Sequence, residues 1–339
     1  MVGSRVRFVR RHLGTILRLA LSLGLIALVL YLFRDQLPAV ALTLRSANLW
    51  LVGLGVLLFW LAMTINAVKW WVLLRPSAVD VPFLGLLNFT FVGFFFNNFL
   101  PANFGGDVMR AYGLARYTER GGVAAASVVL DRIIGLASYM SVAVVAAFIT
   151  VVVTGRSELR VLGYLAVIAS LGLAVIGAVL LSRRVRNLVS KFFTIPFLLP
   201  LAPIWSSLSE AFEAYRTHAT TLLLAYGVGL CGIASTVMVN YVLSQALGGG
   251  IPLLYIFLFT PLIAMVLIIP ISIGGLGLSQ GVYPAFYSLV GVPVSLAFSL
   301  SVLVSATQLF CSLSGGVLWL RWRNKSKKET EAPPSTNDG

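Results

Sequence analysis

The chain consists largely of long apolar runs separated by short basic segments, and this pattern limits the folds open to it. Two of the runs stop early at a proline followed by paired glycines. Six runs are long enough to cross a bilayer as helices, namely 13–33, 49–74, 123–153, 161–181, 219–243 and 294–320. The sequence therefore predicts an all-α, polytopic membrane helix bundle.

Composition supports this class and excludes others. Hydrophobic residues make up 59% of the chain, charged residues 11%, and the mean hydropathy is +0.95, which excludes a soluble domain. The net charge of +14 does not indicate nucleic-acid binding, because Lys and Arg lie between apolar runs and at the termini. Cys231 and Cys311 lie in apolar runs, and His12 and His218 lie at the edges of such runs. We therefore expect no disulfide framework, metal site or cofactor.

The two interrupted runs, 83–100 and 253–270, end in the same skeleton. They continue as Pro101-Ala-Asn-Phe-Gly105-Gly106 and Pro270-Ile-Ser-Ile-Gly274-Gly275. Proline removes a helical hydrogen bond and paired glycines relax the backbone, so both runs should break. Broken backbone at membrane depth persists only inside protein or beside a water-filled cavity, as in transporter sites.

Positive charge decides whether these two runs cross the membrane. The N-terminus, 107–120, 183–191 and the tail from Arg321 should all be cytoplasmic. Eight simple crossings would place 107–120 and 183–191 outside. Six spans plus two re-entrant hairpins place every strongly basic segment inside, with 13–33 retained as the first span and both termini cytoplasmic. The expected location is the cytoplasmic membrane.

The two halves then align at a nearly constant offset of about 170 residues, with three spans and one hairpin in each. An odd number of spans gives the halves opposite orientation, which is an inverted repeat, although chance recurrence of the motif is the alternative. The predicted organisation is a basic cytoplasmic N-terminus at 1–12, a first membrane repeat at 13–153, a second at 161–320 and a disordered cytoplasmic tail at 321–339. The polar segment 203–218 has the alternation of an interfacial helix.

The first break leads into residues that suit an anion. Asp107 can cap a new helix, and Arg110, one turn on, can face the same side. A helix N-terminus beside an arginine is a natural phosphate site. Further donors surround the break, namely Asn97, Asn98 and Asn103. The alternative is a local structural pair between Asp107 and Arg110.

Two further charges lie deep in a predicted span. Asp131 and Arg132 fall about 13 Å into the helix that begins near Val123. Charges at that depth normally face a cavity or a partner, which suits a functional site. The alternative is a purely structural ion pair. Because neighbouring residues diverge by about 100° on a helix, we expect one of them to face the first hairpin and the other to pair elsewhere. Lys69 has a weaker claim, because it can snorkel to the interface.

The second break carries no charge, reading Gly274-Gly275-Leu-Gly277-Leu-Ser279-Gln280. Gln280 could line a polar path or hydrogen-bond a neighbouring helix. An anionic group is therefore expected chiefly at the first hairpin. The candidate substrate-binding residues are Asn98, Asn103, Gly105, Gly106, Asp107, Arg110, Asp131, Arg132, Gly274, Gly275, Gly277 and Gln280.

These residues carry a family resemblance over nearly the whole chain. The chain resembles the flippase-like membrane region of lysylphosphatidylglycerol synthase/flippase proteins and their stand-alone relatives. Three motifs carry this resemblance: the segment from Asn98 through Pro101, Gly105, Gly106, Asp107 and Arg110, then Asp131-Arg132-x-x-Gly135, and later Pro270-x-Ser-x-Gly274-Gly275-Leu-Gly277. Where relatives commonly show Gly-Leu-Gly-x-Arg-Glu-Gly, this chain has Gly275-Leu-Gly277-Leu-Ser-Gln280-Gly281. The loss of both charges puts in doubt any substrate or proton coupling through that hairpin.

The resemblance implies translocation of a phosphate-containing lipid, either a glycerophospholipid or a polyprenyl-linked lipid. The expected partner is thus an anionic or polyprenyl-linked lipid, not nucleic acid. No Gly-x-x-x-x-Gly-Lys-[Ser/Thr] motif is present, so ATP is not the expected drive. The alternatives are a non-transporting scaffold for envelope-lipid enzymes and an intramembrane transferase with Asp107 or Asp131 as base. An aminoacyl-lipid synthase is not expected, because the polar tail after Arg321 is too short for a transfer domain.

Overall fold

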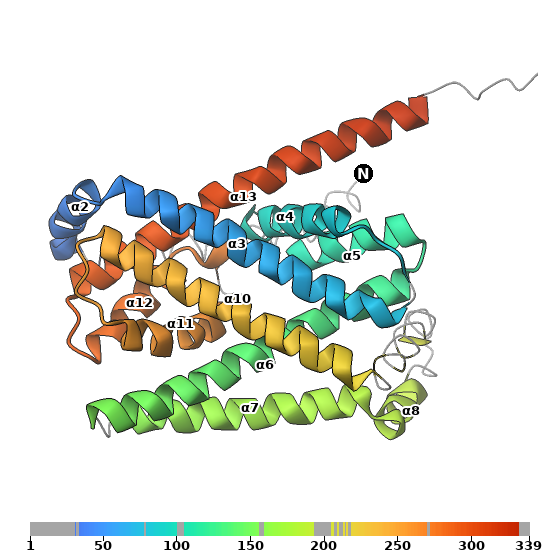
Figure 1. Cartoon of the computed structure of the whole chain (residues 1–339), viewed down its shortest axis with the longest axis horizontal. Helices are drawn as coiled ribbons and strands as arrows, with labels where there is room; N and C mark the ends of the chain where they lie inside the picture. The colour runs from blue at the N-terminus through green and yellow to red at the C-terminus, as the bar shows by residue number, and fades with distance from the viewer. Residues whose placement is uncertain are drawn as a thin grey trace, which may run out of the picture.

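The structure is a computed structural model and describes residues 31, 34–77, 79–99, 105–155, 159–192, 205–206, 209, 213, 215, 218–269 and 272–331. Within these ranges it is all-helical (Figure 1). The first part contains η1 (Arg34–Gln36), α2 (Leu37–Arg45), α3 (Leu49–Leu74), η2 (Arg75–Ser77), α4 (Phe83–Phe99), α5 (Gly105–Thr118), α6 (Gly121–Thr154), α7 (Arg160–Leu181) and α8 (Arg183–Phe192). The second part contains α10 (Ala219–Ala246), α11 (Leu253–Leu267), η5 (Ile273–Gly275), α12 (Leu278–Ser288) and α13 (Val294–Glu331).

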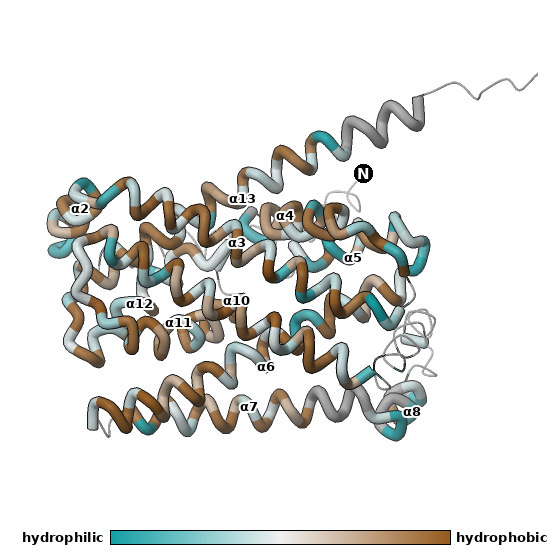
Figure 2. The backbone as a smooth tube through the Cα atoms, viewed as in Figure 1, coloured by the Kyte–Doolittle hydropathy of each residue, from teal (hydrophilic) through white to brown (hydrophobic). Residues whose placement is uncertain are grey.

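Four of the described helical segments are long and apolar enough to cross a membrane: Leu49–Ser77, Gly121–Thr154, Ala219–Ala246 and Val294–Trp322. They coincide with predicted spans, and α7 coincides with the predicted run 161–181. Figure 2 shows the hydrophobic residues spread along α3, α6, α10 and α13, with hydrophilic residues at α8. The predicted span 13–33, with Pro101, Asn103 and Pro270, lies outside the described residues.

Local chemistry explains where these helices begin and end. The Asn48 side chain accepts hydrogen bonds from the backbone N–H groups of Trp50 (3.0 Å) and Leu51 (3.4 Å), which caps α3. Gly155 ends α6 in the left-handed conformation, at φ +66°. The backbone N–H of Asn48 also donates to the carbonyl of Ala246 at 2.8 Å, so the start of α3 meets the end of α10.

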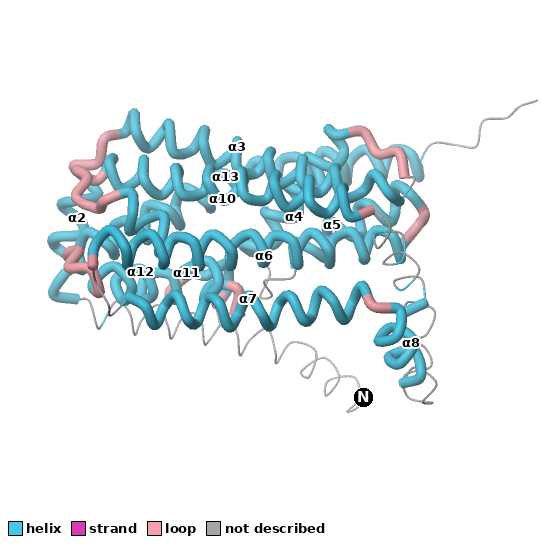
Figure 3. Tube along the Cα trace, turned by 60° about the horizontal axis from the view of Figure 1, so that its bottom comes forward, coloured by secondary structure: helices cyan, strands magenta, loops and turns pink. Residues whose placement is uncertain are grey.

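The most extensive contact between two helices joins α3 and α10, which lie side by side and run in opposite directions (Figure 1). The contacts around this pair come in matching sets. α4 packs on α13 while α11 packs on α6, and α5 packs on α6 while α12 packs on α13. The pair α4 and α5 lies toward one end of the long helices, and the pair α11 and α12 toward the other (Figures 1 and 3).

The two broken segments meet inside the bundle. The end of α4 packs against η5, and a Cβ added to Gly274 would lie 3.1 Å from the carbonyl oxygen of Asn98. The second break is turned by Gly274, Gly275 and Gly277, whose φ angles are +58°, +75° and +81°. Side chains other than glycine rarely adopt such angles, which explains the glycine-rich sequence here.

Two predicted boundaries differ from the structure. α5 begins at Gly105, so Asp107 lies inside its first turn and not at the cap position. There its carboxylate still faces the positive end of the helix dipole. α13 continues to Glu331, so the predicted disorder of the tail does not apply to residues 321–331, which extend an existing helix and need no new nucleus. Residues 332–339 lie outside the described part.

Candidate functional site: a buried charge cluster

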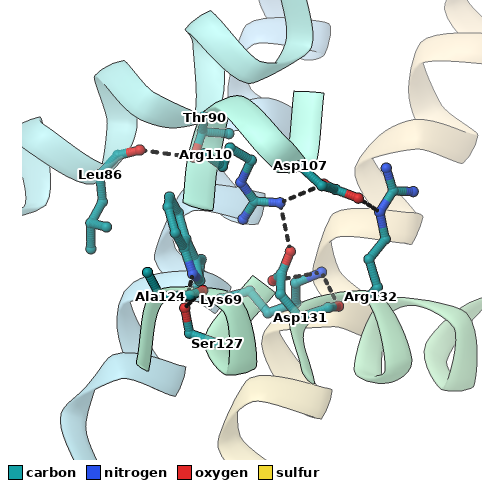
Figure 4. A network of polar contacts seen from close by, with 10 residues as sticks. Lys69, Leu86, Thr90, Asp107, Arg110, Ala124, Ser127, Asp131 and Arg132 are labelled. Carbon is teal, nitrogen blue, oxygen red and sulfur yellow. Dashed lines mark hydrogen bonds and ion pairs between the residues drawn. The ribbon is translucent and has the colours of Figure 1, made fainter. Parts of the chain in front are cut away.

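Five charged side chains from three helices meet at the junction of α3, α5 and α6 (Figure 4). Asp131 of α6 lies at the centre. Its Oδ2 accepts a hydrogen bond from Arg110 Nη1 at 2.9 Å, and its Oδ1 lies 3.2 Å from Lys69 Nζ. Lys69 Nζ also donates to the backbone carbonyl of Asp131 at 3.3 Å. One carboxylate therefore joins a cation of α3 to a cation of α5.

A second carboxylate extends the cluster along α5. Asp107 Oδ1 lies 3.5 Å from Arg110 Nη1, and Asp107 Oδ2 accepts a hydrogen bond from Arg132 Nε. Both Asp131 and Arg132 therefore pair with α5. The expectation that only one of them faces the first hairpin was wrong, because the long side chain of Arg132 reaches Asp107 from the neighbouring position on α6. The local pair between Asp107 and Arg110 exists, but it is longer than the pair between Arg110 and Asp131.

Burial divides the cluster into an inner trio and an outer pair. The side chains of the inner trio are nearly inaccessible, at 7% exposed for Lys69, 7% for Arg110 and 3% for Asp131. In the outer pair Asp107 is 12% exposed and Arg132 is 38% exposed. The inner trio holds two cations and one carboxylate, and the outer pair is neutral. The excess positive charge therefore lies in the most buried part.

Lys69 is fully engaged in this trio and does not extend to a helix end. Its surroundings include glycines that leave room for the amine. A Cβ added to Gly135 would lie 3.2 Å from Lys69 Nζ, and one added to Gly229 would lie 3.6 Å from Lys69 Cδ. Sequence reasoning gave Lys69 too little weight, because a lysine near the end of an apolar run can either snorkel or be buried.

An aromatic ring covers Arg110. The guanidinium Cζ lies 4.2 Å from the centroid of Trp70, which is fully buried, and Trp70 Nε1 donates to Ser127 Oγ at 3.1 Å. Such an arrangement stabilises a cation through the ring quadrupole. Trp70 and Ser127 are site residues that sequence reasoning missed, since nothing local distinguishes them from the core.

Two nitrogens of the Arg110 guanidinium group make no hydrogen bond to the described residues. Its Nε and Nη2 atoms are buried and have no hydrogen-bond acceptor among the described residues. These two nitrogens form one edge of the guanidinium group, while Nη1 serves both carboxylates. A buried donor without an acceptor costs about 1–3 kcal/mol, so such atoms in a native structure call for an explanation.

The hairpin that carries Arg110 is closely packed. A Cβ on Gly106 would lie 2.3 Å from the backbone oxygen of Gly93, and a Cβ on Gly93 would lie 2.6 Å from Arg110 Cγ. The backbones of α4 and α5 can approach this closely only because both positions are glycine. Asn97 lies at the same contact, and its buried Oδ1 has no hydrogen-bond partner in the described part of the chain.

The second hairpin forms neutral contacts of its own. Gln280 Oε1 accepts from the backbone N–H of Gly277 at 2.7 Å, and Gln280 Nε2 donates to Ser305 Oγ at 3.2 Å. Tyr283 donates to Asn240 Oδ1 at 2.9 Å. Gln280 therefore caps α12 and joins it to α13. Within the described part of the chain, no ion pair or hydrogen bond connects it to the charge cluster.

The remaining predicted residues fall between these two places. The side chain of Asn98 donates to the carbonyl of Phe94 in its own helix, at 3.3 Å, and its backbone touches the second break. Gly105 and Gly106 are buried at the start of α5. The structure thus unites Asp107, Arg110, Asp131 and Arg132, and places the glycines and Gln280 in the scaffold.

Tyr215 lies in the segment expected on the membrane surface, yet it is fully buried against Leu73, Leu130 and Ile134. Burial raises the pKa of its hydroxyl, and the negative charge of Asp131 raises it further. The polar segment therefore contributes a buried side chain beside the trio.

The cluster has the chemistry of an anion site. It offers an excess cation, two guanidinium nitrogens without acceptors among the described residues, and the first turn of α5. Groups of three or more His, Cys, Asp or Glu side chains that could hold a metal do not occur among the described residues.

Comparison with known proteins assigns the chain to a family. A membrane protein of the group UPF0104 from Pyrococcus horikoshii is 23% identical over 90% of this chain and 97% of its own length. Another from Methanothermobacter thermautotrophicus is 26% identical over 94% of this chain and 98% of its own length. No solved structure matches. The profile described as the lysylphosphatidylglycerol synthase TM region matches residues 15–315, so the chain is a multi-pass membrane protein that belongs to this family.

Proposed function

We propose that the protein is a lipid flippase of the cytoplasmic membrane, which moves a phosphate-containing lipid between leaflets, and that the charge cluster binds the headgroup. The observation that carries this proposal is Arg110, a buried cation near the start of α5 whose Nε and Nη2 lack acceptors among the described residues. Moving a phosphate headgroup through hydrocarbon is costly. A protein cavity that supplies fixed donors removes much of that cost.

The packing pattern supports an alternating-access mechanism. α4 on α13 corresponds to α11 on α6, and α5 on α6 corresponds to α12 on α13. The exchange of partners by α4 and α11 is what an inverted repeat produces, with α3 and α10 as the corresponding helices of the two halves. We infer that the two hairpins are re-entrant, because they lie toward opposite ends of the bundle (Figure 1). Rocking of one half against the other would then expose the central region alternately.

The charge distribution supports cytoplasmic access to the site. The basic helix α8 lies at the same end of the long helices as the end of α5, which carries Arg116 (Figures 1 and 3). An excess of Arg and Lys marks the cytoplasmic side. The headgroup would therefore be taken up from the cytoplasmic leaflet.

No catalytic role is assigned to the two buried carboxylates. Asp107 and Asp131 both form ion pairs with arginine or lysine side chains, which fits a role in holding the cations of the cluster. Envelope-lipid enzymes would make or use the transported lipid before or after the transport step, and this proposal requires no direct contact with them.

The test is lipid translocation in vesicles that contain the purified protein, measured with a fluorescent phosphatidylglycerol and a membrane-impermeant quencher. Arg110→Gln should slow translocation strongly. Arg184→Gln, which removes an exposed positive charge from α8, should leave the rate unchanged. Equal rates for both variants at matched protein levels would remove the headgroup assignment, and no protein-dependent translocation of any anionic lipid would remove the transport proposal.

A further inference from the structure

The inner trio is unbalanced by one positive charge. Lys69 and Arg110 supply two cations and Asp131 supplies one carboxylate, all at 7% exposure or less. Residues 100–104, the nearest segment along the chain outside the described part, contain no charged residue. An uncompensated buried charge is strongly destabilising, because little solvent remains to stabilise it.

The neighbouring pair does not correct this imbalance. Asp107 is bound to Arg132, and its distance of 3.5 Å to Arg110 exceeds the 2.9 Å from Asp131. Trp70 stabilises Arg110 through its ring, but a ring carries no net charge. Among the described residues, no carboxylate other than Asp131 and Asp107 forms an ion pair with the trio, so one of its positive charges has no counter-charge there.

The geometry of Arg110 indicates how that charge would be held. Nη1 faces the carboxylates, whereas Nε and Nη2, on the adjacent edge, lack acceptors among the described residues. Two parallel donors on one guanidinium edge match two oxygens of a phosphate group. A single phosphodiester supplies two such oxygens and one negative charge, whereas a diphosphate supplies at least two charges.

We propose, building on the headgroup assignment above, that the cluster selects lipids whose headgroup carries one net negative charge on a phosphodiester, and that Lys69 sets this charge preference. A zwitterionic headgroup is disfavoured because its own cation meets the excess positive charge. A diphosphate is disfavoured because it leaves the trio with excess negative charge. Lys69 is a specificity-determining residue in this arrangement, while Arg110 makes the contact.

The test is equilibrium binding of short-chain lipids to the purified full-length protein in mild detergent, which does not depend on translocation. The three probes are dioctanoyl phosphatidylglycerol with one negative charge, dioctanoyl phosphatidylcholine with none, and dioctanoylglycerol pyrophosphate with at least two. The unaltered protein should bind phosphatidylglycerol about tenfold more tightly than either other lipid, which is the scale of one charge-assisted contact.

Two variants should move this preference in opposite directions. Lys69→Met leaves a neutral trio and should abolish the advantage of phosphatidylglycerol over phosphatidylcholine. Asp107→Asn removes one negative charge, so the net charge of the whole cluster rises by one and the preference should shift toward the pyrophosphate. Arg184→Gln, on the exposed face of α8, should leave all three affinities unchanged.

Equal affinity for the three lipids, or the same preference in Lys69→Met and Asp107→Asn as in the unaltered protein, would show that the trio is a structural ion cluster only. Monodispersity and thermal unfolding of each variant separate loss of binding from loss of folding. If the preference holds but vesicles show no translocation, the transport proposal fails while the charge selection remains. If translocation occurs without charge preference, the proposal of charge selection fails while the transport proposal remains.

Discussion

At the scale of single residues, the site depends on one carboxylate shared between two helices. Asp131 binds Arg110 of α5 and Lys69 of α3, and each of the three side chains is nearly inaccessible. Their mutual attraction compensates for much of the cost of burial, and removal of one member leaves the others uncompensated. We therefore expect Asp131 to matter most for stability, while the proposed headgroup binding depends on Arg110.

Asp131→Ala should lower the free energy of unfolding by about 3–5 kcal/mol, because it leaves two buried cations without a carboxylate. Asp35→Ala, whose side chain is 87% exposed, is the matched control and should change little. Unfolding in detergent can be followed by the reactivity of Cys311, which is buried and should become accessible on unfolding. The double variant Lys69→Met with Asp131→Ala should recover part of the loss, and a loss under about 1 kcal/mol in Asp131→Ala would contradict the burial of the trio.

At the scale of elements, the α4–α5 hairpin places Arg110 through close backbone contact. Gly106 and Gly93 face each other so closely that no side chain fits between them. The α11–α12 hairpin is built on positive φ angles and a glutamine cap. The two hairpins share a Pro and Gly skeleton, yet only the first carries charge.

Gly106→Ala should separate α4 from α5 and weaken binding of phosphatidylglycerol at least tenfold, because the added Cβ meets backbone atoms of Gly93 that cannot rotate away. Gly53→Ala, in α3, is the control, since nothing lies within 4 Å of its added Cβ. Alanine also favours a helix over glycine by up to about 1 kcal/mol. Titration of both variants in detergent measures the effect, and unchanged affinity in Gly106→Ala would mean that the hairpin spacing does not set the position of Arg110.

Gln280→Ala should leave the affinity for phosphatidylglycerol within about twofold while slowing translocation, because its side chain caps α12 and bonds Ser305 and makes no described contact with the charge cluster. Arg110→Gln should instead lose affinity, since a charge-assisted hydrogen bond contributes roughly 1.5–3 kcal/mol against about 0.5–1.5 for a neutral one. Titration and vesicle assays on both variants separate these effects. Equal losses of affinity would show that the two hairpins share the headgroup.

At the scale of the whole molecule, packing between the two halves positions the α4–α5 and α11–α12 hairpins. The start of α3 meets the end of α10, and the first helix of each hairpin, α4 or α11, packs on the long helix of the other half. The charge cluster belongs to the first half alone, since its members lie on α3, α5 and α6. The two halves therefore have matching helix contacts, but only the first half carries this group of charges.

Cysteines introduced at Arg116 and Arg184 should resist a membrane-impermeant maleimide in intact cells, whereas one at Arg45 should react. The reason is that Arg116 and the basic α8 lie at the end with the excess of positive charge, and α2 lies at the other end (Figure 1). A Cys231→Ser background removes the exposed native thiol. Labelling of Arg116→Cys from outside the cell would overturn the proposed orientation.

Local sequence patterns were enough to predict the class of the protein, the position of its long helices and the break between α11 and α12. These features depend on local properties, because hydrophobic length predicts a span, and proline and glycine interrupt a helix wherever they occur. The sequence also identified Asp107, Arg110, Asp131 and Arg132 as charges of interest. Each is conspicuous because it lies beside or within an apolar run.

The pairing of these charges could not be predicted from the sequence, because it depends on how distant helices pack. Lys69 and Asp131 are 62 residues apart in the chain, and whether a lysine snorkels or is buried depends on the helix packed against it. Trp70 is an ordinary core residue until Arg110 lies over its ring. The rotation and crossing of α3, α5 and α6 arise from close packing over their whole length, including the contact between Gly93 and Gly106, and no local pattern encodes them.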